Sequence, residues 1–178
     1  MSHIKQNFIL IAFIIAAMSA CTTGNNANAV PVDFVFTVDS LSGQKKSMRN
    51  LHVNIWINAQ GAGRFEYYDN GGTTSYTADD ILTYAPDQVV KSGKFYLTTG
   101  ELQQLWDTLN QNGFFELDEH YEAQLGLSYA FFLVKGNSKS HSVNNIGVEV
   151  PEIRAIIERV DEILPEDINL LYREGFTP

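Results

Sequence analysis

Three histidines beyond the N-terminal segment, His52, His120 and His141, are the side chains best suited to metal binding or to acid–base chemistry near neutral pH. They are far apart in the sequence and show no ligand spacing of the His-x-x-x-His type. The run His120-Tyr121-Glu122 has the His-x-Glu form of zinc deaminases, but the Cys-x-x-Cys that would complete that site is missing. The sequence therefore predicts no metal site and no cofactor, with the histidines in loops and strands.

The other residues with catalytic potential also lack the required pattern. No Gly-x-Ser-x-Gly nucleophile elbow occurs in the chain. Asp79 and Asp80 are adjacent, so on a strand their carboxylates would point apart. An acidic run after residue 115 lacks the layout of a calcium loop and is typical of a solvated face; its members are Glu116, Asp118, Glu119 and Glu122. We therefore expect the chain not to be an enzyme.

Cys21 is the only cysteine, and it directly follows the apolar run 8–20. That run is long enough for the core of a signal peptide and too short to span a bilayer as a helix. The residues before the cysteine resemble a bacterial lipobox, although Met18 stands where leucine is usual. The resemblance implies cleavage before Cys21 and lipidation of its thiol. The alternative is ordinary cleavage after Ala29, in the small-x-small run 27–29, which would leave no cysteine in the mature chain.

This interpretation gives a domain plan and a location. We expect a lipoprotein signal peptide at 1–20, a flexible tether at 21–30 and a single domain at 31–178. Acyl chains on Cys21 would anchor the protein to a membrane of the cell envelope, the outer membrane if the host is diderm. The formal net charge of −9 disfavours nucleic acid as a partner, because an acidic surface repels phosphate.

The hydrophobic pattern predicts an α+β domain. Alternation predicts strands near 33–38, 51–58 and 64–68, joined to one another by turn-rich segments, with Gly61 and Gly63 both in a hairpin connection. Further extended segments are expected near 81–84, 89–97, 127–135 and 139–144. With helices at about 98–112 and 151–164, the order is β-β-β-(β)-α-β-β-α, and the sheet is antiparallel with about five to six strands.

Both helices have clear local signals. Thr98 and Glu101 form the pattern of a capping box at the start of the first helix. Its apolar stripe follows at i, i+3, i+4 and i+7, and consists of Leu102, Leu105, Trp106 and Leu109. Pro151 opens the second helix at a position where its missing N–H costs nothing.

Residues 95–164 resemble an uncharacterised α+β domain of unknown function that occurs in many bacterial lipoproteins. The resemblance is carried by Leu97-Thr98, the stripe 102–109, Gly113-Phe114-Phe115-Glu116-Leu117, Tyr121, His141 and the Pro151-started helix. Residues upstream of 95 fit less closely. The resemblance implies a fold and a lipid anchor, but no activity and no catalytic residues.

Aromatic residues in a polar setting suggest a binding surface. Trp56 lies on the polar side of its strand, beside His52, Asn54 and Asn58. The following segment interleaves tyrosines with Gly, Ser, Thr and Asp, a composition that gives large contact area at low entropic cost; the candidates are Tyr67, Tyr76 and Tyr84. The alternative is that these aromatics form a second small core under the loop 69–87.

Three function classes follow from the sequence. The first is a non-catalytic, lipid-anchored envelope protein that binds another envelope protein or a polymer. The second is an inhibitor-like or assembly-factor module that inserts the loop 69–87 into a partner. The third is an unrecognised hydrolase, which would need a pocket where His52, His120 or His141 meets a carboxylate or a serine.

Overall fold

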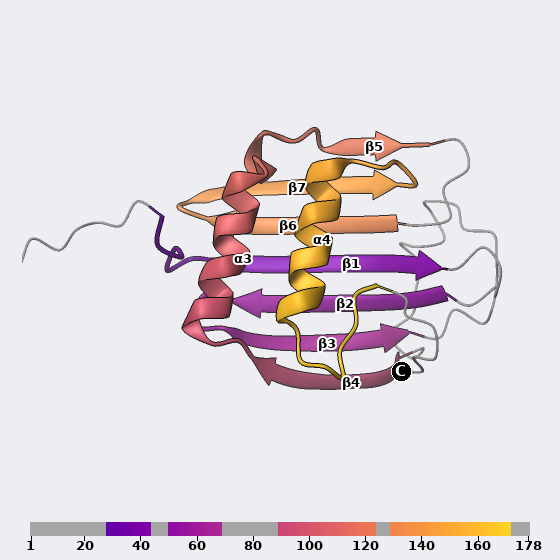
Figure 1. Ribbon diagram of the computed structural model, residues 1–178, viewed down its shortest axis with the longest axis horizontal. Coiled ribbons are helices and arrows are strands. Elements are labelled where there is room, and N and C mark those ends of the chain that lie inside the picture. Colours follow the sequence, from indigo (N-terminus) through magenta and orange to yellow (C-terminus); the bar gives the residue numbers. More distant parts are fainter. Residues whose placement is uncertain (1–27, 44–49, 69–88, 124–128, 172–178) are drawn as a thin grey trace, which may run out of the picture.

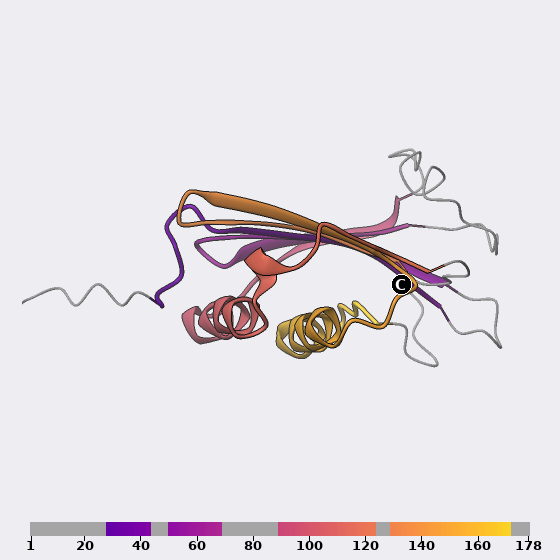
Figure 2. The ribbon, with the colours of Figure 1, turned by 90° about the horizontal axis from the view of Figure 1, so that it is seen from above.

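A computed structural model describes residues 28–43, 50–68, 89–123 and 129–171 of the chain. In this part of the chain a seven-stranded sheet carries two α-helices side by side on one of its faces (Figures 1 and 2). No described helix or strand lies over the other face (Figure 2). The α+β class predicted from the sequence is confirmed.

The strand order in the sheet is β4-β3-β2-β1-β6-β7-β5, so β1 lies in the centre. The bounds in chain order are β1 Val35–Gly43, β2 Asn50–Asn58, β3 Ala62–Tyr68, β4 Val89–Tyr96, β5 His120–Glu122, β6 Tyr129–Gly136 and β7 Lys139–Ile146. The helices are α3 Thr99–Gln111 and α4 Pro151–Ile163, and a 3-10 turn, Phe114–Glu116, follows α3. The chain thus pairs β1 with β2, which follows it directly, and with β6 from a distant part of the sequence.

The predicted antiparallel sheet of five to six strands is corrected in two respects. The sheet has seven strands and is mixed, because β5 pairs parallel with β7 while every other pair is antiparallel. Backbone hydrogen bonds flank β5 on both sides, from Asn144 N to Glu119 O at 2.9 Å and from Ala123 N to Ile146 O at 2.9 Å. A strand of three residues is too short to show alternation in the sequence, which is why it was missed. The extended segment expected near 81–84 lies outside the described residues.

The β2–β3 connection also differs from its prediction. Only Gly61 belongs to the turn, where its φ of 75° is in the left-handed region that glycine adopts without strain. The Asn58 side-chain oxygen accepts the backbone N–H groups of Gln60 and Ala62, each at 3.0 Å, and so holds the turn together. Gly63 lies inside β3 opposite Phe95 of β4, so it is a strand residue and not part of the hairpin connection.

The two helices begin where the sequence predicts. Glu101 N donates to the Thr98 hydroxyl at 3.2 Å, and Thr98 N donates to the Glu101 carboxylate at 2.7 Å, which completes the capping box. This contact lowers the pKa of Glu101. The second helix has Pro151 in its first turn, and it ends at Leu164, which has extended backbone angles. The buried stripe of α3 is the predicted one: Leu102, Leu105, Trp106 and Leu109.

A single large core fills the space between the sheet and the helices. The segment after α4 closes one side of it, since Ile168 and Leu170 are buried. The hydroxyl of Tyr67 donates to the carbonyl oxygen of Asn169 at 3.1 Å and accepts its N–H at 2.6 Å. The buried carboxylate of Asp161 accepts the N–H of Leu170 at 2.7 Å. These hydrogen bonds hold the backbone of residues 169 and 170 against the core.

The first described residues already belong to the folded domain. Gln103 of α3 donates to the carbonyl oxygen of Asn28 at 2.7 Å, and Val30 packs against the core. The carboxylate of Asp33 accepts the N–H groups of Ser138 at 2.7 Å and Asn137 at 2.9 Å, which lowers its pKa. Residues 28–30 of the predicted tether therefore contact the domain, and residues 21–27 lie outside the described residues.

Candidate functional site: the open face of the sheet

Alternation along each strand gives the sheet two different faces. In β2, Val53, Ile55 and Ile57 point into the core and are fully buried, whereas Asn54 and Trp56 lie on the opposite side and are half-buried. We call that opposite side, with the residues that share it on the neighbouring strands, the open face. Antiparallel sheets commonly leave one face to solvent, so its side chains are free to serve something other than the core.

The strand register sorts the open face into rows that run across the sheet. The row through Trp56 contains Lys94, Arg64, Trp56, Thr37, Leu133 and Ser142. The adjacent row contains Tyr96, Ala62, Asn58, Val35, Lys135 and Ser140. We call these two rows together the Trp56 patch.

Arg64 and Trp56 form the centre of this patch. They are direct cross-strand neighbours, and the guanidinium carbon of Arg64 lies 5.5 Å from the centre of the indole ring. A cation over an aromatic face is attracted by the electron-rich ring, which holds the side chain of Arg64 across the patch. Tyr96 lies beside them on the edge strand with 77% of its surface exposed.

The patch is basic, although the chain as a whole is acidic. Every charged side chain among its described residues is positive, namely Arg64, Lys94 and Lys135. The formal net charge of the whole chain is −9. A local basic and aromatic surface on an acidic protein favours an acidic partner at this place and repels one elsewhere.

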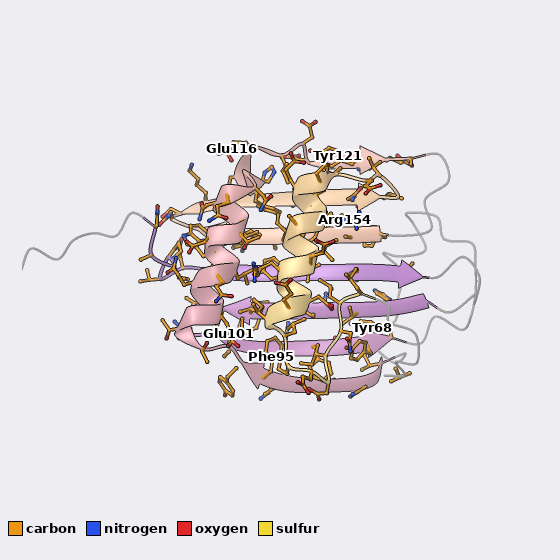
Figure 3. The ribbon with its side chains drawn as sticks, in the orientation of Figure 1. Tyr68, Phe95, Glu101, Glu116, Tyr121 and Arg154 are labelled. Atoms are coloured by element: carbon orange, nitrogen blue, oxygen red, sulfur yellow. The ribbon has the colours of Figure 1, made fainter. Side chains whose placement is uncertain are left out.

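A polar cluster borders the patch in the next rows of the open face. The Nε2 atom of His52 lies 2.7 Å from the Asp39 carboxylate, and the imidazole stacks on the Tyr68 ring with centres 4.7 Å apart. The Tyr68 hydroxyl donates to Glu66 at 2.7 Å (labelled Tyr68 in Figure 3). Burial and the neighbouring charge of Glu66 raise the pKa of Tyr68, so that its phenol stays protonated as a donor.

The three histidines are dispersed over the sheet. His52 on β2 is buried and pairs with the half-buried Asp39, whereas His120 on β5 is exposed and lies 3.1 Å from Glu122. His141 on β7 is within 2.9 Å of the carbonyl oxygen of Leu117 and packs on Phe114. Among the described residues, no group of three or more histidine, cysteine or acidic side chains could hold a metal ion. Of the three, only His52 is itself buried, and it lines neither the cavity at α4 nor the smaller one beside Trp106.

The residues predicted for partner binding fall into three groups. Trp56 is on the open face, as its strand pattern predicts. Tyr67 is fully buried on the other face, next to Phe65 and hydrogen-bonded to Asn169, so it belongs to the core and not to an exposed surface. Tyr76 and Tyr84 lie outside the described residues, as does Cys21.

Sequence reasoning missed Arg64, Lys94 and Tyr96. Alternation within β3 could have found Arg64, because Phe65 and Tyr67 alternate with Arg64 and Glu66. The position of Lys94 and Tyr96 beside them depends on the pairing of β3 with β4, which the sequence does not show.

A second small apolar cluster lies on the open face away from the patch. Leu41 and Tyr129 are its buried members, and Phe131 and Ile146 pack against them. Burial, with a smaller contribution from the charge of Asp39, raises the pKa of Tyr129 to about 12. A second small core was the predicted alternative for the tyrosines; the described cluster contains none of the predicted binding residues.

No protein-family model matches the chain, and no curated protein matches it in sequence. None of the described helices is both long and apolar enough to cross a membrane. The functional conclusions therefore depend on the geometry of the chain itself.

Proposed function

We propose that this protein is a non-catalytic, lipid-anchored component of the cell envelope that binds an acidic envelope protein or polymer through the Trp56 patch. The observation that carries the proposal is the Arg64–Trp56 pair on the sheet face that no described helix or strand covers. Aromatic and arginine side chains are the residue types that dominate binding energy at interfaces.

The composition of the patch supports recognition of acidic partners. Lys94 and Lys135 flank the central pair, so an acidic chain lying across the strands would meet positive charge along its length. Exposed Tyr96 adds a flat apolar surface with a polar hydroxyl at the edge of the sheet. Asn54 and Asn58 supply amide groups for hydrogen bonds on either side of Trp56.

The proposed anchor would hold this surface in the envelope. Cys21 is the proposed site of lipidation, and the folded domain begins by residue 28. The proposed linker between them is short, so the domain would stay close to the membrane surface. Partners in the same membrane or in the adjacent polymer layer would therefore be met at high effective concentration.

The test is photo-cross-linking in intact cells with the full-length chain, with a photoreactive amino acid in place of Tyr96. One dominant acidic envelope protein or polymer should be captured, and Trp56→Ala should remove most of it. A photoreactive residue in place of the exposed Glu152 on α4 is the control for proximity alone. The unfolding free energy of purified Trp56→Ala is measured beside it, because Trp56 is half-buried.

Two further variants separate charge from folding. Arg64→Glu reverses the central charge and should abolish capture of an acidic partner, whereas Lys139→Glu makes the same change on β7 outside the patch and should leave it intact. If Trp56→Ala is strongly destabilised while capture persists, Trp56 is a structural residue and the proposal fails. Equal capture at positions 96 and 152 would also contradict it.

The inhibitor-like or assembly-factor class depends on the loop 69–87, which lies outside the described residues. No observation on the described residues favours it over the Trp56 patch. The hydrolase class would need the His52–Asp39 pair to line a pocket, and the pair lines neither the cavity at α4 nor the smaller one beside Trp106.

A further inference from the structure

A second candidate binding site lies beside α4, at the end of the sheet away from the Trp56 patch. A cavity of about 460 Å³, partly open to solvent, lies there between α4, the ends of three strands and the loop before the helix. Leu41 and Tyr129 of the small open-face cluster line it, as does Leu171 after α4. The volume falls within the range of about 300 to 1,000 Å³ that is typical of small-molecule sites.

The walls of the cavity are mostly apolar. Ile153 and Ile157 come from α4, Val148 and Val150 from the loop that leads into it, and Ala130 from β6. Ile153 and Val150 also belong to the core, so one side of the cavity is backed by well-packed residues. A rigid, apolar wall favours a ligand with an apolar body, because water leaves such a surface at little cost.

Charged side chains also line the cavity, and they are already paired with one another. Arg154 donates to Glu149 at 2.8 Å and to Glu158 at 2.9 Å, and it lies on the side of α4 that faces away from α3 (Figure 3). These three side chains are exposed, so they lie at the solvent side of the site. Two carboxylates against one guanidinium leave a net negative charge there, and both bonds of Arg154 would have to be broken before it could pair with an anionic ligand.

From the apolar walls and the acidic mouth we infer that this cavity binds an uncharged, apolar small molecule. An anionic amphiphile such as a fatty-acid carboxylate would meet Glu149 and Glu158 at the entrance. A neutral ligand meets no such penalty and gains the burial of its apolar surface, at about 25 cal/mol per Å². The inference is independent of the proposed function, because no residue of the Trp56 patch lines the cavity.

A pair of fluorescent probes tests both parts of the inference. N-phenyl-1-naphthylamine is neutral, and 8-anilino-1-naphthalenesulfonate differs from it by one sulfonate. Each is titrated into the chain from Thr22 onward, which contains every described element and needs no detergent that would itself take up the probes. We expect the neutral probe to bind with one site per chain, and the anionic probe to bind at least about tenfold more weakly.

Variants locate the site. Ile157→Trp and Val148→Trp place a bulky ring in the cavity, one from the helix and one from the loop, and each should weaken the neutral probe by about tenfold or more. Two independent positions keep the test decisive if one variant fails to fold. Leu133→Trp makes a similar change on the open face of β6 and should leave the affinity unchanged. Glu149→Gln should improve binding of the anionic probe alone.

Three results would overturn the inference. The first is no saturable binding of the neutral probe, and the second is equal affinity for the two probes. The third concerns the chain's own C-terminal segment, which continues from the lining residue Leu171. If Phe176→Ser in the same chain tightens the neutral probe about tenfold, then that segment is the natural occupant and no small molecule is needed.

Discussion

The two faces of the sheet are built by the same strands, residue by residue in alternation, and they differ in what constrains them. On the covered face the side chains are apolar and packed against α3 and α4, as in the fully buried set Val53, Ile55 and Ile57 of β2. On the open face, polar and aromatic residues occupy the intervening positions without a described element above them. Trp56 and Arg64 are therefore not accounted for by the construction of the core, and this is why we assign them to binding.

The largest expected difference between the faces is the cost of removing an apolar side chain. The ring of Phe132 is fully buried and lies 6.2 Å from both Phe36 and Phe114. We expect Phe132→Ala to lower the free energy of unfolding by about 3 to 5 kcal/mol, because it leaves a cavity in the core. Its neighbour Leu133 points to the open face, and Leu133→Ala should cost about 1 kcal/mol or less. Urea unfolding followed by circular dichroism measures both, and similar losses would mean that the open face is packed like a core.

Two glycines, one in β3 and one in β4, give the next test of the difference between the faces. The backbone of Gly63 lies under the ring of Phe95, where an added Cβ would be 2.3 Å from the ring, and Gly93 lies under Phe65 in the same way. Figure 3 shows Phe95 on β4 at the edge of the sheet. Gly63→Val should cost about 3 kcal/mol, since the ring is displaced from the core. The adjacent Ala62→Val, on the open face, should change the free energy of unfolding by less than about 0.5 kcal/mol in the same assay.

Two adjacent tyrosines provide a smaller contrast. Tyr67 hydrogen-bonds both backbone groups of Asn169 from inside the core, whereas Tyr68 bonds the Glu66 side chain on the open face. Tyr67→Phe should cost about 2 kcal/mol, because it leaves a buried N–H and carbonyl without this partner. Tyr68→Phe should cost about 1 kcal/mol or less. Chemical denaturation gives the difference, and hydrogen exchange at the Asn169 amide should accelerate only in Tyr67→Phe.

The features that the sequence predicted are those with local signals. The capping box at Thr98 and the proline at 151 mark the helix starts within a few residues of sequence, and both helices begin there. The three-residue strand β5 has no such signal, because it exists only through its pairing with β7. The central position of β1 between β2 and β6 is likewise a property of long-range pairing.

The candidate site was likewise predictable where its signal is local and not where it depends on long-range strand pairing. Alternation placed Trp56 correctly, and applied to Phe65 it would have placed Tyr67 in the core, since residues two apart share a face. The approach of Arg64 to Trp56 follows from the register that the Gly61 turn sets. The contribution of Lys94 could not be inferred, because β3 and β4 are separated by a long segment whose path the sequence does not fix.

The last contrast concerns pH and the buried phenol of the open face. Because the pKa of Tyr129 is raised to about 12 in the folded protein, its neutral form contributes stability that is fully present below the ordinary tyrosine pKa near 10. That contribution is lost as the pH rises from about 10 to about 12. Tyr129→Phe cannot ionise, so its free energy of unfolding should fall less steeply over this window than that of the wild type, as urea titrations at successive pH values would measure. Tyr96→Phe, which removes an exposed phenol from the same face, is the matched control. If the two variants show the same slope as the wild type, Tyr129 is as accessible to water as Tyr96, and the small cluster around Leu41 does not shield this end of the open face.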